Sequence, residues 1–280
     1  SLNSPDFYLG SVKEAIRYGA NAFMFYTGAP QNSFRKPLNE LKISEARALL
    51  KEHGFDESKI IVHAPYIINP SNIGKKELFD LSVKLISNEV IRTAGFGCQT
   101  LVLHPGAHVG QGSEVGIKAT AEALDQVFEL ANNNVKIALE TMSGKGNEIG
   151  INFEEVKMII DNCKHKDRLG VCMDTCHISD AGYNIKDFDH VLKEFDQIIG
   201  LDRLLCVHIN DSKNERGAHK DRHENIGYGF IGFDTLNKIV HHPLLNGIPK
   251  VLETPYVNEK PPYKQEISMF RNNKFEDWRK

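Results

Sequence analysis

The sequence predicts a (β/α)₈ barrel, an α/β fold also called a TIM barrel. Apolar runs of strand length recur along the chain, and segments with apolar residues at helical spacing separate them. Six of the runs end on a histidine, an aspartate or a glutamate, and these six residues follow one another at intervals of 34 to 45 residues. Such an interval holds one strand, one helix and two loops, and the carboxyl ends of barrel strands converge on one face. The six side chains are therefore expected to meet around one pocket.

The expected strands are rich in β-branched residues and nearly continuous in apolar character, as parallel strands covered on both faces are. The first is NAFMFYTG, and each of the other six carries one of the six acidic or imidazole residues. In chain order the strands cover residues 21–28, 59–64, 100–105, 136–141, 169–174, 204–210 and 250–254.

Helices are expected between the strands, because the intervening segments place apolar residues three and four positions apart, as with Leu78, Leu81 and Leu85. They cover residues 8–18, 39–52, 75–95, 114–132, 152–163, 187–199 and 233–240, and an eighth helix follows Pro262. Strand and helix alternate without an interdomain linker, so we expect one domain over residues 1–280.

A closed barrel needs an eighth strand, and that strand should precede the first helix. The chain opens with Ser1-Leu2-Asn3-Ser4-Pro5, which is typical of a loop after a strand. We expect a short segment before residue 1 to complete the barrel, because an open barrel would leave unpaired edges on two strands.

Composition narrows the class of protein. Apolar residues make up 41% of the 280 residues and charged residues 25%, which is ordinary for a globular protein. No apolar run approaches the roughly 18 residues of a membrane span, and no signal peptide is visible. The five cysteines are odd in number and lie mostly within or beside apolar runs, which predicts reduced thiols in a cytoplasmic protein. The net charge of -3 argues only weakly against a nucleic-acid partner, because bound metal cations would add positive charge.

The six residues at the strand ends are of the types that bind zinc or a similar divalent ion. A single histidine at a strand end is more often structural, but six residues of this chemistry at corresponding positions favour a metal site. The two glutamates would be costly to bury without a metal or a basic partner, and the strand ends supply no lysine or arginine. The six residues are His63, His104, Glu140, Asp174, His208 and Glu253.

Three further candidate ligands lie outside the strands. Asp221 and His223 belong to the segment 210–232, which is long for a connection within a compact domain and is therefore expected to be functional. They are two residues apart, so both would point to the same side of an extended chain and share an ion. His177 follows Asp174 by three residues, and this pair could bind one ion or two neighbouring ions; alternatively, Asp174 caps a helix.

The strand-end motifs closely resemble those of the endonuclease IV family of apurinic/apyrimidinic endonucleases, and the match spans nearly the whole chain. The motifs are VHAPYIIN, LVLHPGAH, IALETMSGKG, GVCMDTCH, HINDSK, KDRHENIG and LETPY. The resemblance implies a TIM barrel with three Zn²⁺ ions per chain that acts on double-stranded DNA at abasic sites.

The resemblance also implies how nine ligands are shared among three ions. The first group comprises His63, His104 and the bridging Glu140. The second group comprises Glu140, Asp174, His208 and Glu253. The third group comprises His177, Asp221 and His223. Glu140 and Glu253 are predicted to serve in catalysis as well.

Members of this family insert side chains at the abasic site to bend the duplex. Tyr66 and Ile67, in the loop after His63, resemble this wedge. The arginine expected in the loop after residues 21–28 has no clear match, and we predict that Asn32 or Arg35 takes its role.

The implied activity is that of a zinc-dependent hydrolase, deoxyribonuclease IV, in base excision repair. It would cleave the DNA phosphodiester 5′ to an abasic site, leaving a 3′-hydroxyl and a 5′-deoxyribose phosphate. We expect a cytoplasmic monomer without a membrane partner.

Two other classes of protein fit in part. A sugar isomerase or epimerase on a related barrel would need only the second group of ligands and would not require the other five residues. A non-catalytic protein that binds damaged DNA would not need the complete ligand set.

Overall fold

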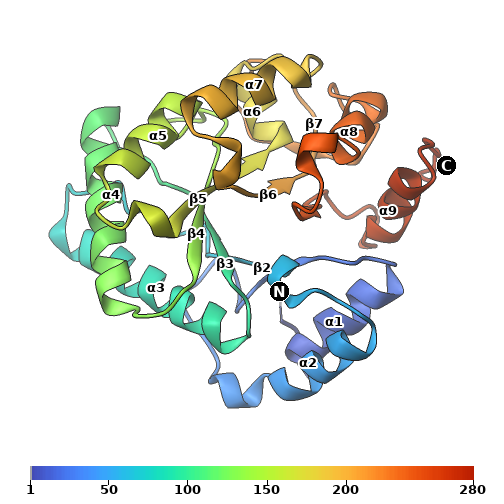
Figure 1. The fold of residues 1–280 in the computed structure, drawn as a ribbon, viewed down its shortest axis with the longest axis horizontal. Helices are drawn as coiled ribbons and strands as arrows, with labels where there is room; N and C mark the ends of the chain where they lie inside the picture. The colour runs from blue at the N-terminus through green and yellow to red at the C-terminus, as the bar shows by residue number, and fades with distance from the viewer. Residues whose placement is uncertain (1) are drawn as a thin grey trace.

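The computed structural model describes residues 2–280 and shows parallel strands surrounded by helices (Figure 1). Seven strands form one sheet in chain order, and every neighbouring pair is parallel. This order arises because each crossover returns the chain beside the preceding strand. The α/β barrel predicted from the sequence is confirmed. The strands are β1 (Met24–Tyr26), β2 (Ile61–His63), β3 (Thr100–Leu103), β4 (Lys136–Glu140), β5 (Leu169–Asp174), β6 (Leu204–His208) and β9 (Lys250–Val251).

The helices form a ring around the strands, and neighbours in the chain pack side by side, α1 on α2, α3 on α4 and α4 on α5. None of the helices within residues 2–280 is long and apolar enough to cross a membrane. The helices are α1 (Phe7–Arg17), α2 (Ile43–Glu52), α3 (Lys76–Gly95), α4 (Ser113–Leu130), α5 (Phe153–Asn162), α6 (Thr175–Ala181), α7 (Phe188–Ile198), α8 (Phe233–Val240) and α9 (Tyr263–Arg271).

The sheet has two edge strands, β1 and β9, and a cavity of about 990 Å³ lies between them. Residues 20–26 line one of its sides and residues 247–253 the other. A closed barrel holds an eighth strand in this position. On this side the residue that follows α1 approaches the start of α9, with the rings of Tyr18 and Tyr263 5.9 Å apart. The seven observed strands match the seven predicted.

Apolar side chains form two cores, one on each side of the sheet. The larger core lies between strands and helices and includes Val62, Leu101 and Val171. The smaller core fills the inside of the barrel with Ile61, Val102, Ala138, Cys172 and Cys206. Because side chains alternate along a strand, the next residue that faces the inside of the barrel lies two positions after each of these five core residues. In these five strands that residue is His63, His104, Glu140, Asp174 or His208.

Two elements differ from the sequence prediction. Helix α6 begins directly after Asp174, whose carboxylate accepts a hydrogen bond from the backbone N–H of His177 at 2.8 Å and so caps the helix. The segment 210–232, predicted as a loop, contains an antiparallel hairpin of β7 (Asp211–Ser212) and β8 (His223–Glu224). Most barrel strands are shorter than predicted, because their apolar character continues into loops beyond the last backbone pair.

Candidate metal centre

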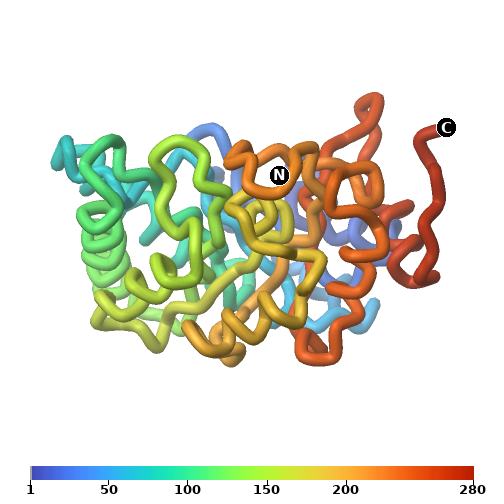
Figure 2. Tube along the Cα trace, turned by 90° about the horizontal axis from the view of Figure 1, so that it is seen from above, coloured from blue at the N-terminus to red at the C-terminus, as the bar shows by residue number. Residues whose placement is uncertain are grey.

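The nine predicted ligands gather at the carboxyl ends of the strands. Six of them end a strand or follow it within two residues: His63 on β2, His104 after β3, Glu140 on β4, Asp174 on β5, His208 on β6 and Glu253 after β9. The other three are His177 on α6, Asp221, and His223 on β8. In Figure 2 the loops that follow the strands lie along the upper edge of the molecule, and the loops that precede them lie along the lower edge. The parallel strand directions thus bring distant parts of the sequence to one mouth.

Glu140 lies at the middle of this cluster and is fully buried. Its Oε2 atom is 3.1 Å from Nε2 of His63 and 3.1 Å from Nε2 of His104. Its Oε1 atom is 3.1 Å from Nδ1 of His208 and 3.3 Å from Nδ1 of His177. One carboxylate between two pairs of imidazoles has the arrangement of a bridging ligand.

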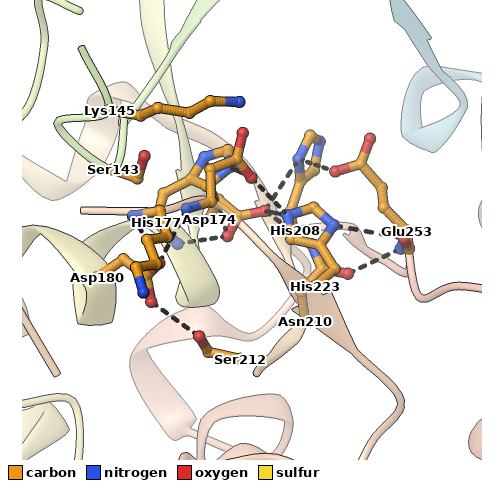
Figure 3. Close-up of polar contacts among 12 residues, drawn as sticks. Ser143, Lys145, Asp174, His177, Asp180, His208, Asn210, Ser212, His223 and Glu253 are labelled. Atoms are coloured by element: carbon orange, nitrogen blue, oxygen red, sulfur yellow. Dashed lines mark hydrogen bonds and ion pairs between the residues drawn. The ribbon is translucent and has the colours of Figure 1, made fainter. Parts of the chain in front are cut away.

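The remaining carboxylates belong to two further groups, and Figure 3 shows Asp174, His177, His208, His223 and Glu253 gathered at this mouth. Nδ1 of His208 is 2.9 Å from Oε2 of Glu253 and 3.6 Å from Oδ2 of Asp174. Oδ1 of Asp221 is 2.9 Å from Nε2 of His177 and 3.6 Å from Nε2 of His223.

Residues 2–280 contain five groups of potential ligand atoms within 4.8 Å of one another, and three of them have the same members as the three groups implied by the sequence motifs; the other two are Cys172, Cys206 and His208, and Asp174, Cys176 and His223. The three shared groups are His63, His104 and Glu140; Glu140, Asp174, His208 and Glu253; and His177, Asp221 and His223. The role of these residues as ligands remains a prediction that their proximity supports.

Backbone carbonyl groups orient three of the imidazoles. Nδ1 of His63 lies 2.6 Å from the carbonyl oxygen of Ala64. Nδ1 of His177 lies 2.9 Å from that of Thr141, and Nδ1 of His223 lies 3.4 Å from that of Glu253. An Nδ1–H group that donates to such a carbonyl leaves the lone pair on Nε2, which faces the cluster. Metal-bound histidines characteristically donate their second ring N–H in this way.

The buried polar atoms of the cluster fit divalent ions. Nε2 of His223, which faces Asp221 at 3.6 Å, is buried without a hydrogen-bond partner in the part of the chain that the structure describes. Buried polar atoms normally have a partner, and a metal ion would provide one for a nitrogen lone pair. Imidazole nitrogens and carboxylate oxygens are the kinds of atom that bind zinc.

Two cysteines adjoin the centre. Cys172 belongs to the core inside the barrel, and Cys176 lies on α6. Burial raises the pKa of both thiols, so they remain protonated at neutral pH in the protein without ions. The packing of Cys172 among apolar side chains inside the barrel favours a packing role for it.

Ion pairs within the cluster shift the pKa values of its side chains more than burial does. Burial by itself raises the pKa of Glu140, but the imidazoles of His208 and His104 hold it well below its ordinary value. Burial by itself lowers the pKa of His177, but the Asp174 carboxylate raises it well above its ordinary value. In the protein without ions, protons on the imidazoles therefore balance the carboxylate charges.

Removal of bound ions is expected to lower Tm more at pH 8 than at pH 6. The pKa values of His177 and His208 are raised in the folded state, so their stabilising contribution is complete below the unfolded value of about 6.5 and declines as pH rises through the folded values. The pKa values of Glu140 and Asp174 are lowered, so their contribution is present at both pH values and lost only in stronger acid. Calorimetry of metal-loaded and chelator-treated protein at the two pH values measures the difference. If removal of the ions lowered Tm equally at both pH values, protons on His177 and His208 would not take over the stabilising role of the ions.

The loop after β2 carries the two residues predicted to enter the DNA. Tyr66 is 54% exposed and Ile67 is 44% exposed, which leaves both side chains free to contact a ligand. Both lie within four residues of His63, at the mouth that holds the metal cluster.

The loop after β1 corrects one prediction. The side chain of Arg35 is only 4% exposed, and its Nε donates to Oε1 of Glu89 at 2.5 Å. Its Nη1 donates to the carbonyl oxygens of Ala29, Asn32 and Phe34. The structure contradicts the DNA-contacting role predicted for Arg35, because the guanidinium is enclosed within the protein and holds this loop. Asn32 is exposed and remains the candidate.

Sequence reasoning missed residues that hold the ligands in place. Asn210 is fully buried; its Nδ2 donates to Oδ2 of Asp174 at 2.7 Å, and its Oδ1 accepts from the backbone N–H of Glu253 at 2.9 Å. Thr141 accepts from the backbone N–H of Asp174 at 3.0 Å through its hydroxyl. The only sequence signal for either is adjacency: each lies one or two positions beyond a predicted ligand.

Comparison with known proteins yields four informative similarities. Residues 12–273 match the family model described as xylose isomerase-like TIM barrel. The chain is 57% identical over 282 residues to a probable endonuclease 4 from Oceanobacillus iheyensis, covering 99% of this chain and 94% of that protein. It is also similar to the crystal structure of endonuclease IV from Thermus thermophilus, with a TM-score of 0.84, 27% identity and coverage of 97% and 95%. A D-tagatose 3-epimerase-like protein shares the fold with a TM-score of 0.70 at 20% identity, over 93% of this chain and 90% of that one.

Proposed function

This chain belongs to the endonuclease IV family, and on that basis we infer that it is an endonuclease that acts on DNA. We propose further that it uses three Zn²⁺ ions to cleave the phosphodiester 5′ to an abasic site during base excision repair, leaving a 3′-hydroxyl and a 5′-deoxyribose phosphate. The observation that carries the proposal is the complete set of nine imidazole and carboxylate ligands arranged around Glu140.

In this proposal each group of ligands holds one ion, and Glu140 serves two of them. His63 and His104 lie on its Oε2 side, whereas His208 lies on its Oε1 side, so the carboxylate would set the separation of two ions. His177, Asp221 and His223 would hold the third ion at the edge of the cluster, where Asp221 and His223 are partly exposed.

A phosphodiester resists hydrolysis because the attacking nucleophile must approach an anion. Zn²⁺ held by these three groups would supply a water of lowered pKa and positive charge near the phosphate oxygens. The Glu253 side chain is 18% exposed and reaches the mouth, so its carboxylate can accept a hydrogen bond from the attacking water and orient it. Glu140, fully buried among four imidazoles, would hold two of the ions and act through them.

The substrate must place its backbone in this mouth, which favours a nucleotide that has left the base stack. Leaving the stack costs least where the base is already lost. Tyr66 and Ile67, exposed beside the cluster, would occupy the gap that remains in the duplex.

A sugar epimerase on the same fold is the alternative. It is supported only by the shared barrel and by one of the three ligand groups. The five additional ligands favour the nuclease, because a small polyol substrate does not require them.

The proposed activity is tested with metal-loaded protein and a duplex that carries one abasic site, beside a duplex of the same sequence with an intact base. We expect one cut, 5′ to the abasic site, and a 3′ end that a polymerase extends. Absence of cleavage, or a cut on the 3′ side, would overturn the proposal. Turnover of a ketose by the same preparation would support the epimerase.

The substitution Tyr66→Ala is expected to weaken binding of abasic duplex by about 5- to 150-fold, because one stacked base contributes roughly 1–3 kcal/mol. Tm should change little, since the ring is 54% exposed. Fluorescence anisotropy with a duplex that carries an uncleavable abasic analogue measures the affinity. Tyr66→Phe keeps the stacking surface and serves as the control. A Tyr66→Ala protein with parental affinity would rule out the wedge.

A further inference from the structure

Asp180 is a fully buried carboxylate near the end of α6 that the proposed chemistry does not use. Within residues 2–280 its hydrogen bonds come only from uncharged groups, and no lysine, arginine or histidine side chain pairs with it. A buried carboxylate without a basic partner is costly unless its oxygens are well satisfied. Its position therefore calls for an explanation beyond packing.

The hydrogen bonds to the Asp180 carboxylate come from Ser212 on β7 and from the segment that follows it, where Nδ2 of Asn214 donates to Oδ2 at 3.3 Å. Oδ1 accepts from the hydroxyl of Ser212 at 2.7 Å (Figure 3). Oδ2 accepts from the backbone N–H of Asp221 at 2.9 Å and of Lys220 at 3.3 Å. The carbonyl oxygen of Asp180 accepts from the backbone N–H of His219 at 3.1 Å. Three consecutive backbone N–H groups, 219 to 221, thus point at one residue.

The backbone of this segment has a conformation that needs such support. His219 and Asp221 both have φ of +53°, in the left-handed region that residues other than glycine rarely adopt. Successive N–H groups in alternating conformations form a concavity that binds an anion, and the Asp180 carboxylate lies in that position. The same φ value shows that Asp221 does not lie on an extended chain, as its spacing from His223 had suggested.

The turn that Asp180 supports carries a ligand of the third group. Oδ1 of Asp221 lies 2.9 Å from Nε2 of His177, and His177 lies on α6 three residues before Asp180. One short helix therefore supplies one ligand and holds the backbone of another.

We propose that Asp180 is a positioning residue for the third metal ion, acting through the backbone of Asp221. This inference rests on the three-ion centre proposed above. Asp180 does not contact substrate or metal; it sets the conformation in which the Asp221 carboxylate meets His177 and His223.

The substitution Asp180→Asn tests this proposal, because the amide keeps the size of the side chain but turns one acceptor into a donor. We expect about 10- to 100-fold weaker binding of one zinc ion per chain, the scale found when groups that orient metal ligands are lost. The other two ions should bind as in the parent. Titration of metal-free protein with zinc, in competition with a chromophoric chelator, measures each affinity. His223→Ala removes a proposed ligand of the same ion and shows how the titration looks when zinc binding at the third site is lost.

Asp125→Asn is the matched control. Asp125 is 8% exposed and also accepts backbone N–H groups, those of Lys164 and His165, but these residues precede β5 at the opposite end of the barrel. This variant should melt at a lower temperature and still bind three ions. If it lost the third ion as Asp180→Asn does, the effect would be general destabilisation and the proposal would be wrong.

Parental affinity for all three ions in Asp180→Asn would also overturn the proposal. If that variant does not fold, Ser212→Ala provides the test, because it removes the shortest hydrogen bond to Asp180. We then expect zinc to bind about 3-fold more weakly at the third site. Unchanged zinc affinity at that site would overturn the proposal. The metal titration is independent of catalysis. A parent protein that binds three ions but leaves abasic DNA intact would refute the nuclease activity and leave the role of Asp180 standing.

Discussion

Replacing Glu140 with glutamine is expected to lower kcat for abasic-site cleavage by at least about 100-fold. Glu140 lies within 3.3 Å of four imidazoles, and glutamine has one acceptor oxygen and one amide nitrogen in place of the two carboxylate oxygens. The nitrogen cannot bind an ion beside the histidines that it faces. Two of the proposed ions would therefore lose a shared ligand, and the charge that they present to the phosphate would be reduced or displaced.

The measurement is single-turnover cleavage of an abasic duplex, with zinc content determined on the same samples. Glu129→Gln makes the same chemical change at an exposed position on α4 and should keep parental activity. Folding is followed by circular dichroism, so that a loss of rate is not confused with a loss of protein. Near-parental turnover with full zinc content in Glu140→Gln would show that Glu140 is not the bridging ligand.

Replacing Glu89 with alanine is expected to lower the free energy of unfolding by about 3–5 kcal/mol. Glu89 and Arg35 form an ion pair at 2.5 Å whose side chains are 3% and 4% exposed. Oε2 of Glu89 also accepts from the hydroxyl of Thr27 at 2.7 Å. Without the carboxylate the Arg35 guanidinium would remain buried beside Arg92 with no opposite charge, and burial already lowers the pKa of Arg92.

Urea unfolding of the parent and the variant measures this change, and each kcal/mol should also lower Tm by about 2–4 °C. Glu40→Ala is the control, because Glu40 pairs with Lys36 at the surface and such pairs contribute roughly 0–1 kcal/mol. A loss below about 1 kcal/mol in Glu89→Ala would mean that Arg35 finds solvent or another partner. The variant should also loosen the loop that carries Asn32, since Arg35 holds three carbonyl oxygens of that loop.

The error over Arg35 has a physical origin. An arginine in a loop at the mouth of a barrel is as compatible with a phosphate as with a buried carboxylate, and the guanidinium suits both. The choice depends on Glu89, which lies 54 residues away on α3 and has no sequence feature that marks it as a partner. Only packing of α3 against the loop after β1 decides it.

For the fold and the site as a whole, too, some features follow from local sequence patterns and others from the packing of distant elements. The alternation of strand and helix, the parallel sheet and the gathering of the six strand-end residues at one mouth were predictable from the sequence, because each depends on short-range patterns. Side chains alternate along a strand, so an inward-facing apolar residue such as Ala138 predicts that Glu140, two positions later, faces inward as well. Parallel strands then place every such residue at the same end of the barrel.

Tertiary structure alone decided how the ligands are held. The orientation of His177 depends on the Thr141 carbonyl, and the left-handed turn at Asp221 depends on Asp180. In each case the two groups lie more than 30 residues apart, and the groups that do the holding are ordinary in type: a main-chain carbonyl and an aspartate in a short helix. A sequence shows which side chains can bind a metal, because that is a property of the residue. It does not show which backbone groups will face them, because that depends on how the elements pack.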